Sequence, residues 1–208
     1  MIRSGTTLRG IGRRTEGVQR AAHRRRLLRL LPRSSTGVEI GVWEGDFAAL
    51  ALRIVRPARL HLIDPWRFVS EPAYERAWYG GAIAESQEDM DRVYTGVLAR
   101  FAGEIERGIV RVHRGPSAEA AALFAEDSLD WVYVDGNHGY EFVSRDLEEY
   151  FARLRGGGVI CGDDYMPPYG WWGDSVTRAV DEFSRSLGLP VRLIGRQWVI
   201  ERPVRALG

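Results

Sequence analysis

The segment VRLIGRQWVIER, residues 191–202, holds two short apolar runs that suit β-strands. Only Arg196 separates VRLIG from QWVIER. Parallel strands need a crossover connection of a dozen or more residues, so we expect these two strands to pair antiparallel. This closing hairpin decides between classes of α/β fold, because a dinucleotide-binding Rossmann sheet normally ends in further parallel strands.

Strand-like runs alternate with helical patterns through the rest of the chain. The expected strands are 36–43, 59–66, 109–115, 129–136 and 157–165, and the expected helices are 46–55, 88–102, 117–126, 140–155 and 175–188. Continuous apolar strands alternating with helices are typical of a parallel sheet covered on both faces. We therefore predict an α/β fold, a doubly wound, mostly parallel, seven-stranded Rossmann-like sheet with an antiparallel last strand.

The domain organisation follows from length and composition. A chain of 208 residues with a net charge of +1 suits one domain without a polycationic character. We expect an Arg-rich N-terminal helical extension over 1–35 and a domain over 36–208, with a lid insertion at 67–96. The Arg-rich start also resembles a transit peptide, but RRRLLRLLP suits an amphipathic helix leading into the domain. With no apolar run of about 20 residues, we expect a cytoplasmic protein without a membrane span.

Polar groups follow every parallel strand of the predicted sheet. Ligands of such sheets bind at the carboxyl ends of the strands. The first strand runs into a turn that contains Gly41 and Gly45, and the second ends at Asp64. Glycines permit a tight turn and a close ligand, although no GxGxxG is present. An acid some twenty residues after such a turn can accept ribose hydroxyls, in nicotinamide cofactors and in S-adenosylmethionine (SAM) alike.

The fourth and fifth strands end in acids. Asp135, Asp163 and Asp164 should meet at the sheet edge, and converging carboxylates repel one another unless a cation lies between them. Oxygen ligands suit Mg²⁺, Mn²⁺ or Ca²⁺. Because adjacent strand side chains point to opposite faces, Asp163 and Asp164 can share one ion only if the strand has already ended there.

His138 follows Asp135 by three residues, and two interpretations of it remain open. A turn there could aim both side chains at one cavity, where an imidazole can accept a proton. Equally, His138 could be a surface residue at the start of the 140–155 helix. Aromatic residues crowd the same region, and we expect an acceptor to stack on some of them: Tyr165, Tyr169, Trp171 and Trp172.

Together, EIGVWEG, LIDPW, HRGPSAE, DWVYVDGNHGY and GGGVICGDDY resemble a class I SAM-dependent methyltransferase over residues 36–165. More narrowly, they are similar to the metal-dependent sugar O-methyltransferases of the macrocin and mycinamicin type. The resemblance implies that His138 and Asp135 are catalytic and that Mg²⁺ or Mn²⁺ binds Asp135, Asp163 and Asp164. It also implies that the SAM site includes Glu39, Gly41, Gly45, Asp64, Ser117 and Asp135. Ser117 has a second interpretation as the N-cap of its helix.

The expected function is Mg²⁺-dependent methyl transfer from SAM to a hydroxyl of a glycoside, oligosaccharide or polysaccharide. A catechol-type O-methyltransferase acting on a planar acceptor is the alternative. A nicotinamide-dependent oxidoreductase and an RNA-modifying protein are weaker alternatives. The last would use the ten arginines of residues 1–35 as a phosphate-binding arm. We expect a small-molecule or glycan substrate and no nucleic-acid partner, and the aromatic insertion is compatible with a homodimer.

Overall fold

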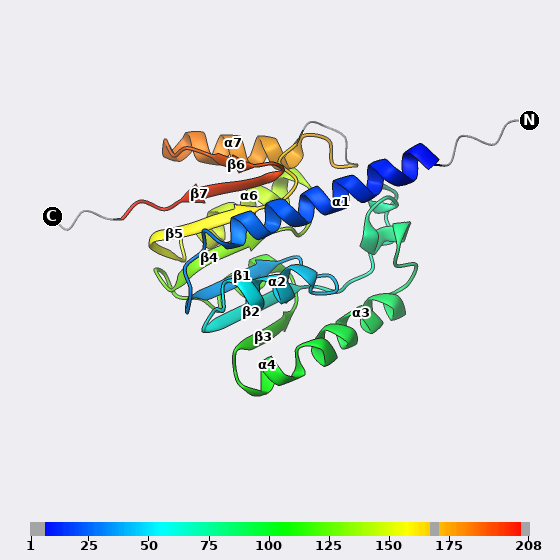
Figure 1. Cartoon of the computed structure of the whole chain (residues 1–208), viewed down its shortest axis with the longest axis horizontal. Coiled ribbons are helices and arrows are strands. Elements are labelled where there is room, and N and C mark those ends of the chain that lie inside the picture. The colour runs from blue at the N-terminus through cyan, green and yellow to red at the C-terminus, as the bar shows by residue number, and fades with distance from the viewer. Residues whose placement is uncertain (1–6, 167–170, 205–208) are drawn as a thin grey trace, which may run out of the picture.

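A seven-stranded sheet in the order β3-β2-β1-β4-β5-β7-β6 forms the centre of the molecule (Figure 1). The computed structural model describes residues 7–166 and 171–204. The strands are β1 (Thr36–Ile40), β2 (Arg59–Asp64), β3 (Val110–Arg114), β4 (Leu129–Val134), β5 (Leu154–Gly162), β6 (Arg192–Ile194) and β7 (Gln197–Glu201). The five strands β1 to β5 pair parallel, whereas β7 runs antiparallel to both β5 and β6. The predicted sheet and its closing hairpin are confirmed.

Helices cover both faces of this sheet. They are α1 (Thr7–Leu28), α2 (Asp46–Ile54), α3 (Gln87–Arg100), α4 (Ala102–Glu106), α5 (Ser117–Ala121), α6 (Tyr140–Phe151) and α7 (Ser175–Leu187). One buried cluster lies between the sheet and α1, α2 and α3, and a second lies under α5, α6 and α7. No helix within the described ranges has the length and apolar character needed to cross a membrane.

The parallel strands end earlier than the sequence predicts, because the chain turns before the polar residues, and β5 also begins earlier, at Leu154. Strand β1 ends at Ile40, and Gly41 then takes a φ of 83°. Strand β5 ends at Gly162, and Asp164 lies in the left-handed region with a φ of 62°. The helix predicted over 117–126 is also shorter, since α5 ends at Ala121. The polar motifs therefore lie in loops at the carboxyl edge of the sheet.

Two further segments lie over this edge. Between β2 and α3 the chain makes a 3₁₀ turn (Pro72–Tyr74) and a short π-helical segment (Trp78–Ala82). The long helix α1 lies along the face that also carries α2, and its N-terminal half extends toward this insertion (Figure 1). The C-terminal part of α1 is fixed by the fully buried side chains of Leu27 and Leu28. The C-terminal part of α1 therefore belongs to the hydrophobic core.

Candidate active site

Three carboxylates meet where β4 and β5 end. Asp135 follows β4, and Asp163 and Asp164 follow β5, which is the neighbouring strand. The left-handed backbone of Asp164 turns its side chain back toward the same space as Asp135. Because β5 ends at Gly162, Asp163 and Asp164 lie beyond the strand, which is the condition that strand geometry imposed on their sharing one cation.

Two arginines of α1 bind this acidic cluster. Arg24 Nη2 lies 2.5 Å from Asp135 Oδ2 and 2.8 Å from Asp163 Oδ2. Arg20 Nε lies 2.6 Å from Asp163 Oδ2. Arg20 Nη2 is also 3.7 Å from Asp135 Oδ1 and 3.5 Å from Asp164 Oδ2. A third guanidinium, that of Arg196 in the β6–β7 turn, pairs with Asp164 Oδ1.

Helical periodicity explains why these two arginines point inward. Residues four apart lie on one face of a helix, so Arg20, Arg24 and Leu28 form a single stripe. Leu28 anchors the stripe in the core, and Arg24 lies one turn nearer the site with its guanidinium 5.9 Å from the Tyr133 ring. Neither arginine was predicted as a site residue, although the continuation of the Leu28 stripe through positions 24 and 20 was visible in the sequence.

His138 completes the cluster. Its Nε2 lies 3.0 Å from Asp164 Oδ2 and 3.6 Å from Asp135 Oδ1, and its ring stacks on Trp172 at 4.4 Å. Neither carboxylate contact has hydrogen-bond geometry, so Nε2 is buried without a hydrogen-bond partner. The placement does not match a surface histidine that only starts α6. Asp135, His138 and Asp164 offer three ligand atoms within 4.8 Å of one another, which suits a divalent cation.

The charges of the cluster shift its protonation. Burial lowers the pKa of His138, but the adjacent carboxylates of Asp135 and Asp164 outweigh burial and raise that pKa to about 9. Burial also opposes ionisation of Asp164, yet His138, Arg20 and Arg196 hold its pKa below the ordinary range. His138 is therefore a cation at neutral pH in this state. It can act as a base only when another cation neutralises the carboxylates.

Asp163 is placed differently from the other two acids. Its side chain is fully buried, and its Oδ2 accepts hydrogen bonds from Arg20 and Arg24. Its Oδ1 accepts the backbone N–H of Asp164 at 2.8 Å. Both oxygens are thus already satisfied by the protein. The structure brings Asp163 to the expected place but engages it as an anchor for α1 and for the Asp164 turn.

The turn after β1 combines two glycines with a buried acid. A Cβ on Gly41 would lie 2.1 Å from the backbone oxygen of Asp135, and Gly45 has a φ of 81°. Gly41 is therefore required by backbone packing as well as by its conformation. Glu39 is 1% exposed, and its Oε2 has no hydrogen-bond partner. Burial raises the pKa of Glu39 well above its ordinary value. A buried, unpartnered carboxylate beside the turn suits a cationic group of a ligand.

Asp64 fastens the same turn. Its Oδ2 accepts the backbone N–H groups of Val42 at 2.9 Å and Trp43 at 3.0 Å. Its Oδ1 accepts the N–H of Trp66 at 2.7 Å. Burial raises the pKa of Asp64, and the three amide donors oppose that rise. The acid expected at the ribose thus also shapes the backbone around it.

Ser117 is not the N-cap of α5, because Pro116 occupies that position and no side chain caps the helix. Instead, Ser117 Oγ donates to Asp146 Oδ1 of α6 at 2.5 Å, and its carbonyl oxygen accepts the hydroxyl of Tyr150 at 2.7 Å. Burial raises the pKa of Asp146 to about 7. The sequence analysis did not identify Asp146, which lies in the interior of an amphipathic helix pattern.

An aromatic wall borders the acidic cluster. Trp171 lies 6.3 Å from His138 and 5.4 Å from Tyr74 of the insertion, in ring centroid distances. Tyr74 also accepts a hydrogen bond from Asn137 at 3.2 Å. Tyr165 is directed elsewhere, since its hydroxyl donates to Asp181 of α7 at 2.8 Å. Tyr169, the remaining predicted acceptor contact, lies outside the described residues.

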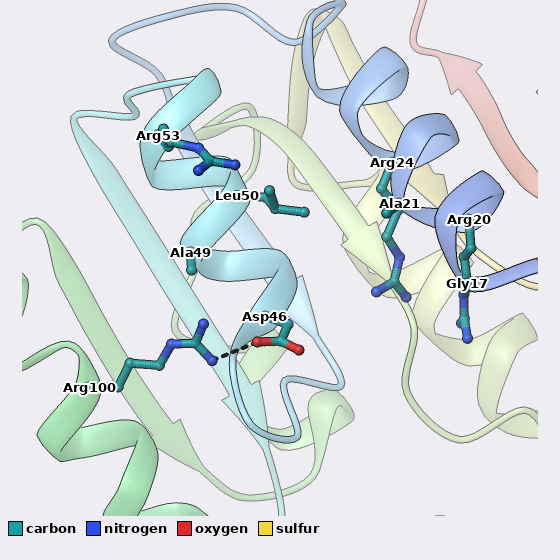
Figure 2. A pocket seen from close by; sticks show the side chains of 9 residues that line it. All are labelled: Gly17, Arg20, Ala21, Arg24, Asp46, Ala49, Leu50, Arg53 and Arg100. Carbon is teal, nitrogen blue, oxygen red and sulfur yellow. Dashed lines mark hydrogen bonds and ion pairs between the residues drawn. The ribbon is translucent and has the colours of Figure 1, made fainter. Parts of the chain in front are cut away.

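A pocket of about 410 Å³ separates α1 from α2 beside this cluster (Figure 2). Arg20 and Arg24 line it from α1, and Asp46 and Arg53 line it from α2. Figure 2 shows Asp46 bound to Arg100, a contact of 2.8 Å. The pocket thus runs along α2 from its first turn to its last.

A protein family described as "Methyltransferase domain" matches residues 38–165. That segment contains β1, the glycine turn, β2 with Asp64, and the loops after β4 and β5. A search among curated proteins finds no match for this chain.

Several solved structures share the fold. A protein from Corynebacterium glutamicum superposes with a TM-score of 0.61 at 16% identity, over 99% of this chain and 94% of that one. The O-methyltransferase NovP gives a TM-score of 0.62 at 19% identity, over 89% of this chain and 80% of NovP. Aeropyrum pernix fibrillarin, solved with bound S-adenosyl-L-methionine, gives 0.53 at 14% identity, over 82% of this chain and 66% of fibrillarin.

Proposed function

Because this chain belongs to the methyltransferase domain family and is a SAM-dependent methyltransferase, we propose that it methylates a hydroxyl of a sugar with the help of Mg²⁺. The observation that carries the proposal is the meeting of Asp135, His138 and Asp164 within 4.8 Å at the carboxyl edge of the sheet. The acceptor would be a glycoside, oligosaccharide or polysaccharide. The likeness to NovP, an O-methyltransferase, supports oxygen as the methylated atom.

The residues around the glycine turn suit SAM. Glu39 Oε2 is buried and unpartnered, and would pair with the ammonium group of the methionine part. Gly41 keeps the turn close to the loop after β4, where Asp135 would border the cofactor, and Gly45 gives the turn its left-handed backbone beside Phe101. Asp64 and Ser117 would face the ribose and the adenine. When bound, SAM supplies an activated methyl group, and Mg²⁺ makes an acceptor hydroxyl more acidic.

The chain's own residues then position the acceptor and handle its proton. Asp135 and Asp164 would hold the cation, with His138 at their side. Once the cation neutralises these carboxylates, Nε2 of His138, which is buried and free of hydrogen bonds, would be placed to take the hydroxyl proton. The wall formed by Trp171, Trp172 and Tyr74 would stack on the acceptor ring and exclude water. We propose that the insertion at 67–96 closes over the bound molecules as a lid.

The alternatives differ in what they require of this site. A catechol-type acceptor would use the same cation and the same aromatic wall, so only the product distinguishes it. An RNA-binding arm fits less well, because Arg20 and Arg24 turn inward to the acidic cluster. The match of residues 38–165 to a methyltransferase family counts against a nicotinamide-dependent oxidoreductase. The homodimer, the cytoplasmic location and the division at residue 35 stay predictions.

An acceptor screen tests the proposal. The protein would be incubated with isotopically labelled SAM, Mg²⁺, and separate sets of glycosides, catechols and short RNAs, and products would be analysed by mass spectrometry. We expect a gain of one labelled methylene on a sugar hydroxyl. A labelled catechol or RNA with unchanged sugars would contradict the sugar proposal.

A substitution tests the role of His138. His138→Ala should lower turnover by about a hundredfold or more, as expected for a general base, while SAM affinity stays within about twofold. Tyr140→Phe, a substitution in the adjacent helix that removes a hydroxyl bound to Glu182, is the matched control. If the His138→Ala variant kept the turnover of the unmodified protein, His138 would not be the base and its role would be structural.

A further inference from the structure

Arg20 and Arg24 share Asp163 Oδ2, and beyond that shared atom the three arginines at the acidic cluster contact different oxygens. Arg24 binds Asp135 Oδ2 and Asp163 Oδ2, and Arg196 binds Asp164 Oδ1. Arg20 Nη2 instead approaches Asp135 Oδ1 and Asp164 Oδ2. These last two are the oxygens that also face His138 Nε2. Arg24 and Arg196 thus hold the other oxygens of the cluster, whereas Nη2 of Arg20 lies against the atoms that a cation would use.

We propose that Arg20 is an internal competitor of the divalent cation, which must displace the Arg20 guanidinium to bind Asp135 and Asp164 beside His138. The inference rests on the proposed function. Three carboxylates already face three guanidiniums here, so a dication would add two positive charges to a balanced set, and the departure of one guanidinium would halve that excess. Arg20 keeps the buried acids paired when no metal is bound, and α1 thereby becomes a gate on the site.

The surroundings of Arg20 allow it to leave. Its side chain is 30% exposed, against 17% for Arg24, whose guanidinium lies 5.9 Å from the ring centroids of both Phe47 and Tyr133. The pocket of about 410 Å³ between α1 and α2 lies beside Arg20 and contains the carboxylate of Asp46 (Figure 2). A change of side-chain rotamers can therefore move the guanidinium without moving the helix, whose residues Leu27 and Leu28 are fully buried.

Mn²⁺ binding measured by isothermal titration calorimetry tests this competition. Arg20→Leu should bind Mn²⁺ at least about tenfold more tightly than the unmodified protein, because the metal no longer has to break the guanidinium contacts. Arg26→Leu removes an exposed charge from the same helix and should leave the affinity within about twofold. No gain of affinity for Arg20→Leu would overturn the proposal.

A second variant separates displacement from a general effect of charge. Arg196→Leu removes one positive charge from the same cluster but vacates only Asp164 Oδ1. Arg20→Leu should gain more affinity than Arg196→Leu, and equal gains would contradict the proposal. Should Arg20→Leu fold poorly without metal, Arg20→Gln is the replacement, and Mn²⁺ should raise its Tm more than that of the unmodified protein. An equal rise in both would also count against displacement.

SAM titration in the same samples keeps the two proposals apart. If SAM binds and sugars are methylated while Arg20→Leu shows no gain for Mn²⁺, the competition is wrong and the proposed function stands. If neither sugar methylation nor SAM binding occurs, the proposed function is wrong.

Discussion

Arg24 offers the sharpest stability prediction, because its guanidinium bridges two acids that have little contact with solvent. Its Nη2 lies 2.5 Å from Asp135 Oδ2 and 2.8 Å from Asp163 Oδ2, and the Asp163 side chain is fully buried. Removing one partner of a buried ion pair costs about 3–5 kcal/mol. Arg20 still contacts Asp163 at 2.6 Å, so we take the lower limit of about 3 kcal/mol for Arg24→Leu.

For a chain of this size, that loss corresponds to a Tm lower by about 6–12 °C. Urea and thermal unfolding of Arg24→Leu, Asp163→Asn and the double variant would complete a double-mutant cycle. We expect a coupling energy of about 2 kcal/mol, since the double variant no longer buries an unpaired charge. Arg26→Leu, on the exposed side of α1, should change stability by less than about 0.5 kcal/mol. Additive single effects, or an unchanged Tm for Arg24→Leu, would refute the bridging role.

Two further predictions concern the folded state. Burial raises the pKa of Asp146 from its ordinary value of 3.8 to about 7, so the unfolded chain ionises first as pH rises. The free energy of unfolding should then fall between about pH 4 and pH 7, by up to about 4 kcal/mol relative to the Asp146→Asn variant. Urea unfolding of both proteins across this pH range measures the difference. Parallel pH curves for the two proteins would contradict the prediction. Gly41→Ala would combine a φ of 83° with a Cβ 2.1 Å from the Asp135 carbonyl oxygen. This substitution should lower the free energy of unfolding by at least about 2 kcal/mol and weaken SAM binding, as measured by calorimetry. Gly96→Ala, whose Cβ meets nothing within 4 Å, should change neither quantity.

The fold could be predicted from sequence because its decisive signals are local. The single residue between VRLIG and QWVIER rules out a parallel crossover, and each apolar run of the parallel sheet is followed by a helical pattern. The placement of Asp135 beside Asp164 was also predictable, since parallel strands bring their carboxyl ends to one edge. The ends of the strands were less predictable, because they depend on left-handed residues such as Asp164 that carry no glycine signal.

The partners of the acidic cluster were not predictable in the same way. Arg20 and Arg24 precede Asp135 by more than a hundred residues, and their role depends on how α1 packs against the sheet. The burial of Asp163 and the pairing of Ser117 with Asp146 likewise arise from tertiary contacts. Residue types at strand ends therefore indicate where chemistry can occur, whereas the state of each group depends on the elements packed around it.

Anomalous diffraction from crystals grown with Mn²⁺ tests directly whether a cation binds the acidic cluster and displaces Arg20. We expect a peak within bonding distance of Asp135 and Asp164 and beside His138, with the Arg20 guanidinium moved toward the pocket between α1 and α2. Asp163 should keep its contact with Arg24. The absence of a peak at these side chains at saturating Mn²⁺, or a peak there with Arg20 still bound to the same oxygens, would contradict it.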